Sequence, residues 1–331
     1  MLTLLVAIAI GFSTISPAQK NRSTAPEKVP SLLAGLPQSD AVALVQVRRL
    51  LDEAMPKILA NNATKLTDVN AELDKFKTTT GVDPRACDQI ALGMRYTYPS
   101  ANVTKVDTVA LARGKFNTSA IVAAGRAASD GQYREEKYQG RTIYVFTLDQ
   151  TLRVFGLMNL KVHELAVTAL DANTLALGKP EDVRRAIDAG KGRGGLNQEL
   201  IALATREPNA VIGFGGNVTP ALIQSLKLSN EATVQEISSI RQVYGSVGTT
   251  EKDVEMFLAA RTINADSAKD LSTTLEGLKQ LGAFFVSRMP APKGSVARTA
   301  LDNLKITTEG NELQIRTAVA QADLGPLFGG K

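Results

Sequence analysis

The chain has 331 residues, of which 44% are hydrophobic and 21% are charged, so it can bury a core of ordinary size and has room for about two domains. Its formal net charge is +5, with Lys and Arg interspersed among Asp and Glu, so we predict no nucleic-acid partner. The single Cys excludes an intrachain disulfide, and one His with one Cys excludes a metal site built from several such residues.

The N-terminal segment has the pattern of a secretory signal peptide. Leu2–Phe12 is a short apolar run, and Ser16-Pro17-Ala18 places small residues where a signal peptidase cleaves. We therefore expect a signal peptide over residues 1–18, a polar linker over 19–30, and a periplasmic or extracellular mature chain. That mature chain has no apolar stretch approaching the roughly 20 residues that a membrane span needs. Because no Lys or Arg precedes the apolar run, a buried N-terminal strand or helix is the alternative.

The first half of the mature chain predicts a mixed order of strands and helices, from hydrophobic periodicity and turn residues. The predicted elements are a strand over 40–47, helices over 48–60 and 66–76, strands over 89–97 and 106–114, a helix over 118–128 capped by Asn117, hairpins over 132–146 and 165–177, and a helix over 180–189 with Pro180 in its first turn. A Gly-rich loop over 190–195 ends this half.

The second half predicts nearly the same order. Pro208-Asn209-Ala210-Val211 repeats the pattern of Ser39-Asp40-Ala41-Val42, each opening a strand that leads into a helix. There follow helices over 219–228 and 231–240, strands over 242–248 and 254–263, a long helix over 266–285, a hairpin over 305–319, and a tail over 323–328 at the position of the 180–189 helix. We therefore predict an α+β fold of two degenerate repeats, 31–195 and 196–331, each a mainly antiparallel sheet with helices packed on one face. The sheets could join across the halves.

Two segments carry a resemblance to other proteins. Leu36 to Val45 reads Leu-Pro-x-x-x-Ala-Val-Ala-Leu-Val, and Leu-Gly-Lys-Pro-Glu-Asp-Val-Arg-Arg-Ala-Ile stands between Leu175 and Leu196, before a Gly-rich loop. This pattern resembles exported bacterial proteins of uncharacterised families with duplicated α+β units. The resemblance implies an envelope location and an α+β repeat, and it implies no active-site residues.

The sequence has few candidate catalytic residues. His163 stands alone, and the nucleophile elbow Gly-x-Ser-x-Gly of the Ser-His-Asp hydrolases is absent. Cys87 precedes an apolar strand, where a small buried thiol is expected rather than a reactive thiolate. We predict no catalytic residue, no metal site and no cofactor.

Phosphate and calcium loops are also poorly matched. The loop 190–195 has a Lys but lacks the Ser or Thr that follows it in a Walker motif. Gly213-Phe214-Gly215-Gly216 has two of the three glycines of a dinucleotide loop, and we interpret it as a tight turn between a strand and a helix. Asp68 to Asp74 alternates oxygen-bearing residues but lacks the Gly of a calcium loop, so we interpret it as a solvated helix face.

One hairpin is the best candidate for a contact surface. Tyr133, Tyr138, Arg141 and Tyr144 lie together in 132–146, where aromatic and basic side chains alternate. The competing interpretation is cross-strand packing within the sheet.

The sequence favours a non-enzymatic exported protein that binds another protein or an envelope component. Two alternatives remain open: a hydrolase with an unusual Ser/Lys or carboxylate centre, and a carrier of apolar ligands. A carrier predicts an enclosed apolar pocket of about 300–1,000 Å³. An enzyme predicts ionisable side chains with shifted pKa values converging in a cleft. A binding module predicts an exposed apolar patch of several hundred Å².

Overall fold

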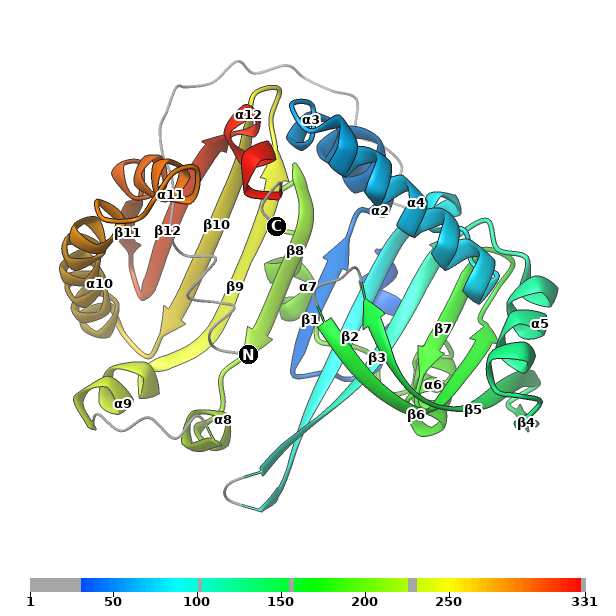
Figure 1. Cartoon of the computed structure of the whole chain (residues 1–331). Helices are drawn as coiled ribbons and strands as arrows, with labels where there is room; N and C mark the ends of the chain where they lie inside the picture. Colours follow the sequence, from blue (N-terminus) through cyan, green and yellow to red (C-terminus); the bar gives the residue numbers. More distant parts are fainter. Residues whose placement is uncertain (1–30, 101–102, 155–157, 226–230, 329–331) are drawn as a thin grey trace, which may run out of the picture.

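The fold is built on one continuous antiparallel sheet. The computed structural model describes residues 31–100, 103–154, 158–225 and 231–328, and the predicted signal peptide and linker lie outside them. Within these residues 12 strands follow the order β11-β12-β10-β9-β8-β1-β2-β3-β7-β6-β5-β4 (Figure 1). The predicted α+β class and antiparallel sheet are confirmed.

The strands fall where alternating and β-branched residues predict them, with longer hairpins than expected. Their bounds are β1 Ala41–Val45, β2 Cys87–Ser100, β3 Val103–Gly114, β4 Tyr133–Tyr138, β5 Arg141–Val154, β6 Met158–Ala169, β7 Thr174–Gly178, β8 Ala210–Asn217, β9 Ile240–Thr249, β10 Asp253–Thr262, β11 Lys305–Glu309 and β12 Glu312–Ala320.

Several helices, including the longest two, begin at a side chain that satisfies free backbone N–H groups of the first turn. Asn62, Asn117 and Asn264 each accept such a hydrogen bond, at the start of α4, α5 and α10 respectively. The α-helical segments are α2 Val47–Arg49, α3 Met55–Ile58, α4 Ala63–Thr80, α5 Thr118–Ala128, α6 Pro180–Ala189, α7 Gln198–Ala204, α8 Pro220–Ser225, α9 Glu231–Ser238, α10 Ala265–Val286, α11 Lys293–Asp302 and α12 Gln321–Leu324; a π-helical turn, Leu50–Ala54, joins α2 to α3, and short 3₁₀ turns lie at η1 Leu32–Gly35, Pro84–Ala86 and η4 Gly325–Phe328.

The two halves join through a single strand pair. β1 and β8 run antiparallel, with Ala41 opposite Gly216 and Val45 opposite Ile212. Outward from this pair, the first half continues β1-β2-β3-β7-β6 and the second continues β8-β9-β10-β12-β11, so the corresponding strands occupy corresponding places. This order is the one that a duplication predicts. The duplication itself and its boundary at 195/196 remain a prediction.

Helices lie on both faces of the sheet. On one face, Leu258 of β10 and Ile315 of β12 pack against α10 and α11, and Phe146 of β5 packs against α5. On the other face, the buried side chains of α6 and α7 join the main core with Ile143 and Leu44. The structure thus adds a second helical layer to the single layer that we predicted.

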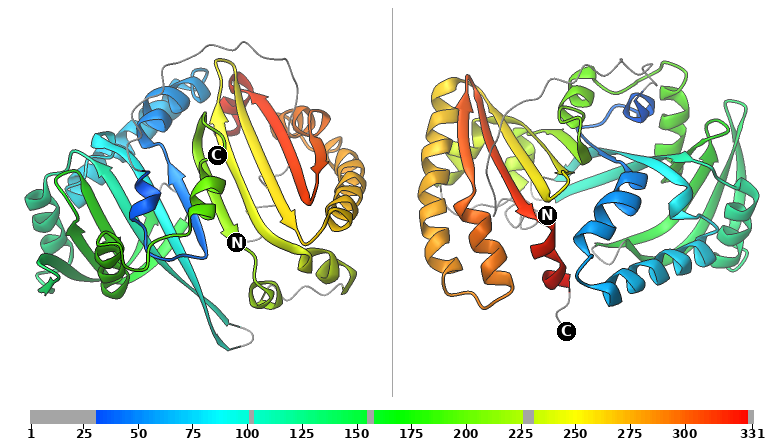
Figure 2. Two further views of the ribbon diagram at one scale, coloured as in Figure 1. Left: turned by 180° about the vertical axis from the view of Figure 1, so that it is seen from behind. Right: turned by 90° about the horizontal axis from the view of Figure 1, so that it is seen from above.

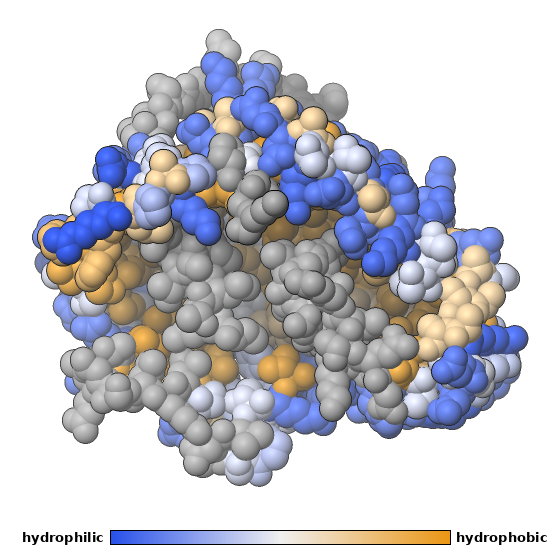
Figure 3. All heavy atoms as spheres, viewed as in Figure 1, coloured by the Kyte–Doolittle hydropathy of each residue, from blue (hydrophilic) through white to orange (hydrophobic). Residues whose placement is uncertain are grey.

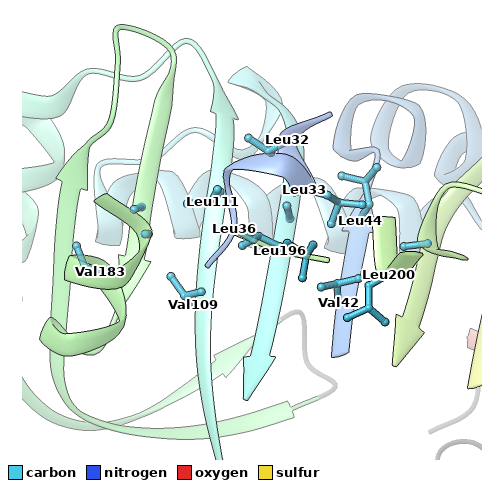
Figure 4. Close-up of a cluster of buried hydrophobic side chains, with 14 of the residues drawn as sticks. Leu32, Leu33, Leu36, Val42, Leu44, Val109, Leu111, Val183, Leu196 and Leu200 are labelled. Carbon is cyan, nitrogen blue, oxygen red and sulfur yellow. The ribbon is translucent and has the colours of Figure 1, made fainter. Parts of the chain in front are cut away.

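The main core lies at the junction of the halves, on the α6/α7 face. Figure 4 shows Leu33 and Leu36 of the N-terminal turn lying over Val42 and Leu44 of β1, with Leu200 of α7 beside them. All of these side chains are buried. Burial of apolar area at about 25 cal/mol per Å² makes this cluster the main force holding the halves together.

The Gly213–Gly216 motif lies inside β8 rather than in a turn. A Cβ atom at Gly213 would stand 2.0 Å from the Ala204 carbonyl oxygen, and one at Gly215 would stand 2.9 Å from the Leu203 Cβ. The missing side chains therefore let α7 lie directly against the strand. Our interpretation of this motif as a strand-to-helix turn was wrong, because the strand continues to Asn217 before α8 begins.

The tail does not repeat the position of α6. Leu324 and Leu327 pack with Val296 and Val319, on the α10/α11 side of the sheet. The corresponding helix of the first half, α6, lies on the opposite side. Seen from behind in Figure 2, none of the helices of the described residues stands in front of the outer strands of the second half, β10, β12 and β11. Our prediction for residues 323–328 was therefore wrong in place, although the segment is helical.

Candidate docking surface

The long helix α10 is amphipathic over its whole length but buries only one side. Ala268, Leu271 and Val286 are buried, and Leu275 packs against the cluster formed by Leu301 and its neighbours. These positions recur at helical spacing on the side that faces the sheet. Lys279 lies on the same side and donates from Nζ to the Leu304 carbonyl oxygen at 2.6 Å, which fixes the helix against the start of β11.

The second half of α10 carries large apolar side chains on its outer side. Leu278 is 56% exposed, Leu281 60%, Phe284 54%, Phe285 66% and Met289 42%. We call these five residues the α10 patch. Figure 3 shows apolar colour gathered at the edge of the molecule where Figure 1 places α10. An apolar cluster of this kind on a protein surface marks a site of interaction.

The surroundings of the α10 patch are basic. From residue 277 to residue 301 the chain has no Asp or Glu, and its charged residues there are Lys279, Arg288, Lys293 and Arg298. The Arg288 guanidinium lies 4.1 Å from the Phe284 ring centroid, so a cation caps one ring of the patch. A partner is therefore expected to offer an apolar surface flanked by acidic groups.

An open groove of about 610 Å³ runs beside the first half of the same helix. It lies between α9 and α10, and polar and apolar surface contribute about equally to its walls, with Ile263 and Leu271 as its apolar residues. Thr274 of α10 donates to the Glu236 carboxylate of α9 at 3.1 Å across the groove. Its lining residues are Gln235, Glu236, Ser238, Ser239, Ile263, Ser267, Asp270, Leu271, Thr273 and Thr274.

The hairpin that we singled out is present, with its turn at Gln139-Gly140. Both turn residues have positive φ, 50° and 81°, as a tight two-residue hairpin requires. The side chains of Tyr133 and Tyr144 lie on the α5 face, where Tyr133 stacks 6.4 Å from Phe146 and both pack against the α5 cluster.

Tyr138 and Arg141 lie on the opposite face, towards α6. The Tyr138 hydroxyl donates to Asp188 Oδ2 at 2.7 Å, and Arg141 donates to the Ala169 carbonyl oxygen at 2.8 Å. The four predicted residues are therefore divided between the two faces and do not form one contact surface. Their contacts are those of packing within the fold, and a binding role for them stays a prediction.

The residues that we considered for catalysis lie apart from one another. Cys87 is buried, and burial raises the pKa of its thiol to about 11, so the thiol is uncharged at neutral pH. His163 is exposed on β6. Among the described residues, no group of three or more His, Cys, Asp or Glu side chains could hold a metal ion.

The buried carboxylates lie in ion pairs of the scaffold. Asp107 is 4% exposed and accepts from Lys179 Nζ at 2.5 Å, with Lys105 and Arg95 within 4 Å of it. Burial alone would raise the Asp107 pKa, but Lys179 and Lys105 outweigh it and hold the pKa below its ordinary value. The ion pair between Asp107 and Lys179 thus keeps Asp107 ionised next to the start of α6.

Comparisons with known proteins give only distant likenesses. No family model matches the chain, and no curated protein matches it. It is similar to crystal form III of TP0453, with 12% identity and a TM-score of 0.46 over 89% of this chain and 96% of that one. Crystal form IV of TP0453 gives 10% identity and a TM-score of 0.46 over 90% and 96%. At this level of similarity we carry no role from TP0453 to this chain.

The α10 patch escaped the sequence analysis although a signal was present. Residues 281–286 read Leu-Gly-Ala-Phe-Phe-Val, which places apolar residues around the whole circumference of the helix. The earlier turns of the same helix have polar residues on one side. A helix packed on a sheet can bury only about 100° of its circumference, so the excess predicts an exposed apolar face. No helix in the described ranges has the length and hydropathy of a membrane span.

Proposed function

We propose that the chain is an exported, non-enzymatic protein that binds another protein through the α10 patch. The observation that carries the proposal is the exposure of Phe285 and Leu281, at 66% and 60%, on a helix whose other side is firmly packed. Fully burying side chains of this size contributes about 1.5–3 kcal/mol each, so a partner that covers several of them gains substantial affinity.

The two alternatives receive less support from the geometry. The groove beside α10 is open to solvent rather than enclosed, and a second cavity, between β1 and the end of α7, has only about 190 Å³. A carrier of apolar ligands needs an apolar pocket of about 300 Å³ or more. A hydrolase with a Ser/Lys or carboxylate centre needs ionisable side chains that converge in a cleft, whereas the buried acids Asp107 and Glu312 are paired with Lys179 and Arg206 of the scaffold.

Site-specific photo-crosslinking in the native host tests the proposal. A photoreactive amino acid replaces Phe285, and in a matched strain it replaces Phe76, which is 45% exposed on α4. We expect discrete protein adducts from position 285 and none from position 76. Equal labelling from both positions, or no protein adduct from position 285, contradicts a docking role for the patch.

A further inference from the structure

The α10 patch and the α9/α10 groove share one face of one helix. Ser267, Asp270, Thr274, Gly277, Leu281, Phe284 and Arg288 recur at alternating spacings of three and four residues, which aligns them along the helix. Ser267, Asp270 and Thr274 line the groove, whereas Leu281 and Phe284 belong to the patch. One continuous stripe is therefore concave at its start and apolar and protruding at its end.

The two ends of this stripe are complementary in shape. Asp270 in the groove and Phe284 in the patch are equidistant from Gly277, and the 14 residues between them span about 21 Å of helix. A second α10 laid antiparallel across Gly277 brings each patch opposite the other copy's groove. There Ile263, which is 53% exposed, offers an apolar contact to the incoming rings.

The two ends are also complementary in charge. Asp266 and Asp270 lie in the first turns of α10, whereas Arg288 follows its last turn and the chain nearby has only basic charged residues. In the antiparallel arrangement Asp266 of one copy lies opposite Arg288 of the other, since both are 11 residues from Gly277. Opposite charges across an interface fix its register and orientation.

The midpoint of the stripe permits close approach. A Cβ atom at Gly277 would meet no atom within 4 Å, so the helix surface there is open. The absence of a side chain at the crossing point lets two helices approach without a clash, and Leu278 and Leu281 then pack on either side of it.

We propose that the partner of the α10 patch is a second copy of this chain, in a dimer in which α10 packs antiparallel to its counterpart about a two-fold axis near Gly277. Each patch fills the α9/α10 groove of the other copy. The assignment rests on the proposed docking function and names its partner. A two-fold interface requires one surface to carry both the protruding element and its receptacle, and α10 with its groove meets that requirement.

Sedimentation velocity of the purified full chain over a concentration series gives the first test. We expect the mass of two chains for the wild type. Phe285→Ser is expected to weaken the dimer at least about tenfold, because each dimer loses two anchoring rings. Phe76→Ser, the matched change of an exposed ring on α4, is expected to leave the dissociation constant unchanged. A wild-type chain that stays monomeric at high concentration overturns the dimer.

A charge exchange tests the orientation. Asp266→Arg and Arg288→Asp are each expected to weaken the dimer, since each places like charges opposite one another. The chain carrying both changes is expected to recover most of the lost affinity, because the pairing is restored with reversed sign. Absence of recovery, with both single variants weakened, contradicts the antiparallel register.

Thiol cross-linking tests the axis. Gly277→Cys places a thiol beside its own symmetry mate, and a short bifunctional thiol reagent should join two chains through it. Thr67→Cys on the exposed side of α4 is the control, and the natural Cys87 is buried and should not react. A dimer that forms without cross-linking at position 277 uses another surface.

The results separate the two proposals. If the chain is monomeric in solution but forms protein adducts from position 285 in the host, the dimer proposal is contradicted and the docking proposal is supported. A monomeric chain that gives no protein adduct, and instead binds vesicles of anionic phospholipid through Phe285, loses both.

Discussion

The same strand positions are covered in two different ways in the two halves. In the first half, α6 lies over the sheet and its Val183, Ala186 and Ile187 pack against Ile143 and its apolar neighbours. In the second half, no helix within the part of the chain that the structure describes covers the outer strands on that face (Figure 2). There three guanidinium groups cover two aromatic rings, with Arg206 5.3 Å and Arg261 5.9 Å from the Tyr244 ring centroid and Arg316 4.0 Å from that of Phe257.

Two of these guanidinium groups, those of Arg206 and Arg261, are held by a buried carboxylate, and Arg316 pairs with Glu207. Glu312 of β12 is 8% exposed, and both of its carboxylate oxygens accept from the same Arg206 nitrogen, Nη1, at 2.9 and 3.1 Å. Arg206 also donates to the Tyr244 hydroxyl, and Arg261 lies 3.7 Å from Glu312 Oε2. A sheet face can thus be shielded from water by charged side chains that lie flat on rings, because their stems are apolar and their heads remain partly hydrated.

The comparison predicts that the helix-covered face contributes more stability than the ion-covered face. Ile187→Ala removes a fully buried side chain of α6 and leaves a cavity, so we expect the free energy of unfolding to fall by about 2–5 kcal/mol. Denaturant unfolding measures the change. Val106→Ala, at a position that is 37% exposed, is the control and should cost less than about 0.5 kcal/mol.

Glu312→Gln tests the ion-covered face. The change keeps the shape of the side chain but removes the charge that Arg206 and Arg261 share, and we expect a loss of about 1–2 kcal/mol because both guanidinium groups remain partly hydrated. Glu309→Gln, the same change at an exposed position of β11, should be close to neutral. An equal cost for Glu312→Gln and Ile187→Ala would remove the distinction between the two faces.

The Glu312 variant also carries a pH signature. Burial alone would raise the Glu312 pKa, but Tyr244 and Arg206 outweigh it and hold the pKa below its ordinary value. The ionised carboxylate therefore contributes stability above its unfolded pKa, and this contribution is lost as the pH falls through the lower folded pKa. The stability difference between wild type and Glu312→Gln should shrink on acidification.

Much of the fold follows from local sequence signals. Asn117 and Pro180 mark helix starts, and Gln139-Gly140 supplies the φ values of its hairpin turn, so these elements are where the sequence predicts them. The two-layer arrangement did not follow, because period-2 alternation says which residues share a face but not which faces receive helices. The strand pair at the middle of the sheet could not be located from the sequence either, because the pairing of β1 with β8 joins residues that are far apart in the chain.

The candidate site was less predictable. The hairpin tyrosines drew attention because aromatic residues are few, but cross-strand packing and α5 and α6 account for their contacts. The sequence predicted a long helix over 266–285 but did not separate its buried apolar residues from its exposed ones, since helical spacing alone cannot distinguish a buried stripe from an exposed one. In the structure α10 packs against β12 and β11, the last strands of the sheet on that side, and the large apolar side chains of its second half are exposed.

The smallest expected effect concerns Asp182, a buried acid of α6. Its contribution to stability should change with pH in the direction opposite to that of Glu312. Asp182 is fully buried, one oxygen pairs with Arg185, and Oδ2 has no hydrogen-bond partner among the described residues. Burial raises the Asp182 pKa, and Arg185 offsets only part of that rise. Below the Asp182 pKa of the unfolded chain, the wild type therefore has its largest stability relative to Asp182→Asn. This advantage is lost as the pH rises through the higher Asp182 pKa of the folded protein.

Unfolding free energies of wild type and Asp182→Asn at several pH values between about 3 and 7 measure this change. The exposed Glu181→Gln, which removes a charge from the same helical turn, gives the contribution of the helix dipole alone. As the pH falls, we expect the free energy of unfolding of the wild type to rise relative to that of Asp182→Asn. Over the same range we expect it to fall relative to that of Glu312→Gln. If the stability difference changes in the same direction with pH for both variants, the pKa values of Asp182 and Glu312 are shifted in the same direction. The proposed contrast between the helix-covered face and the ion-covered face would then be wrong.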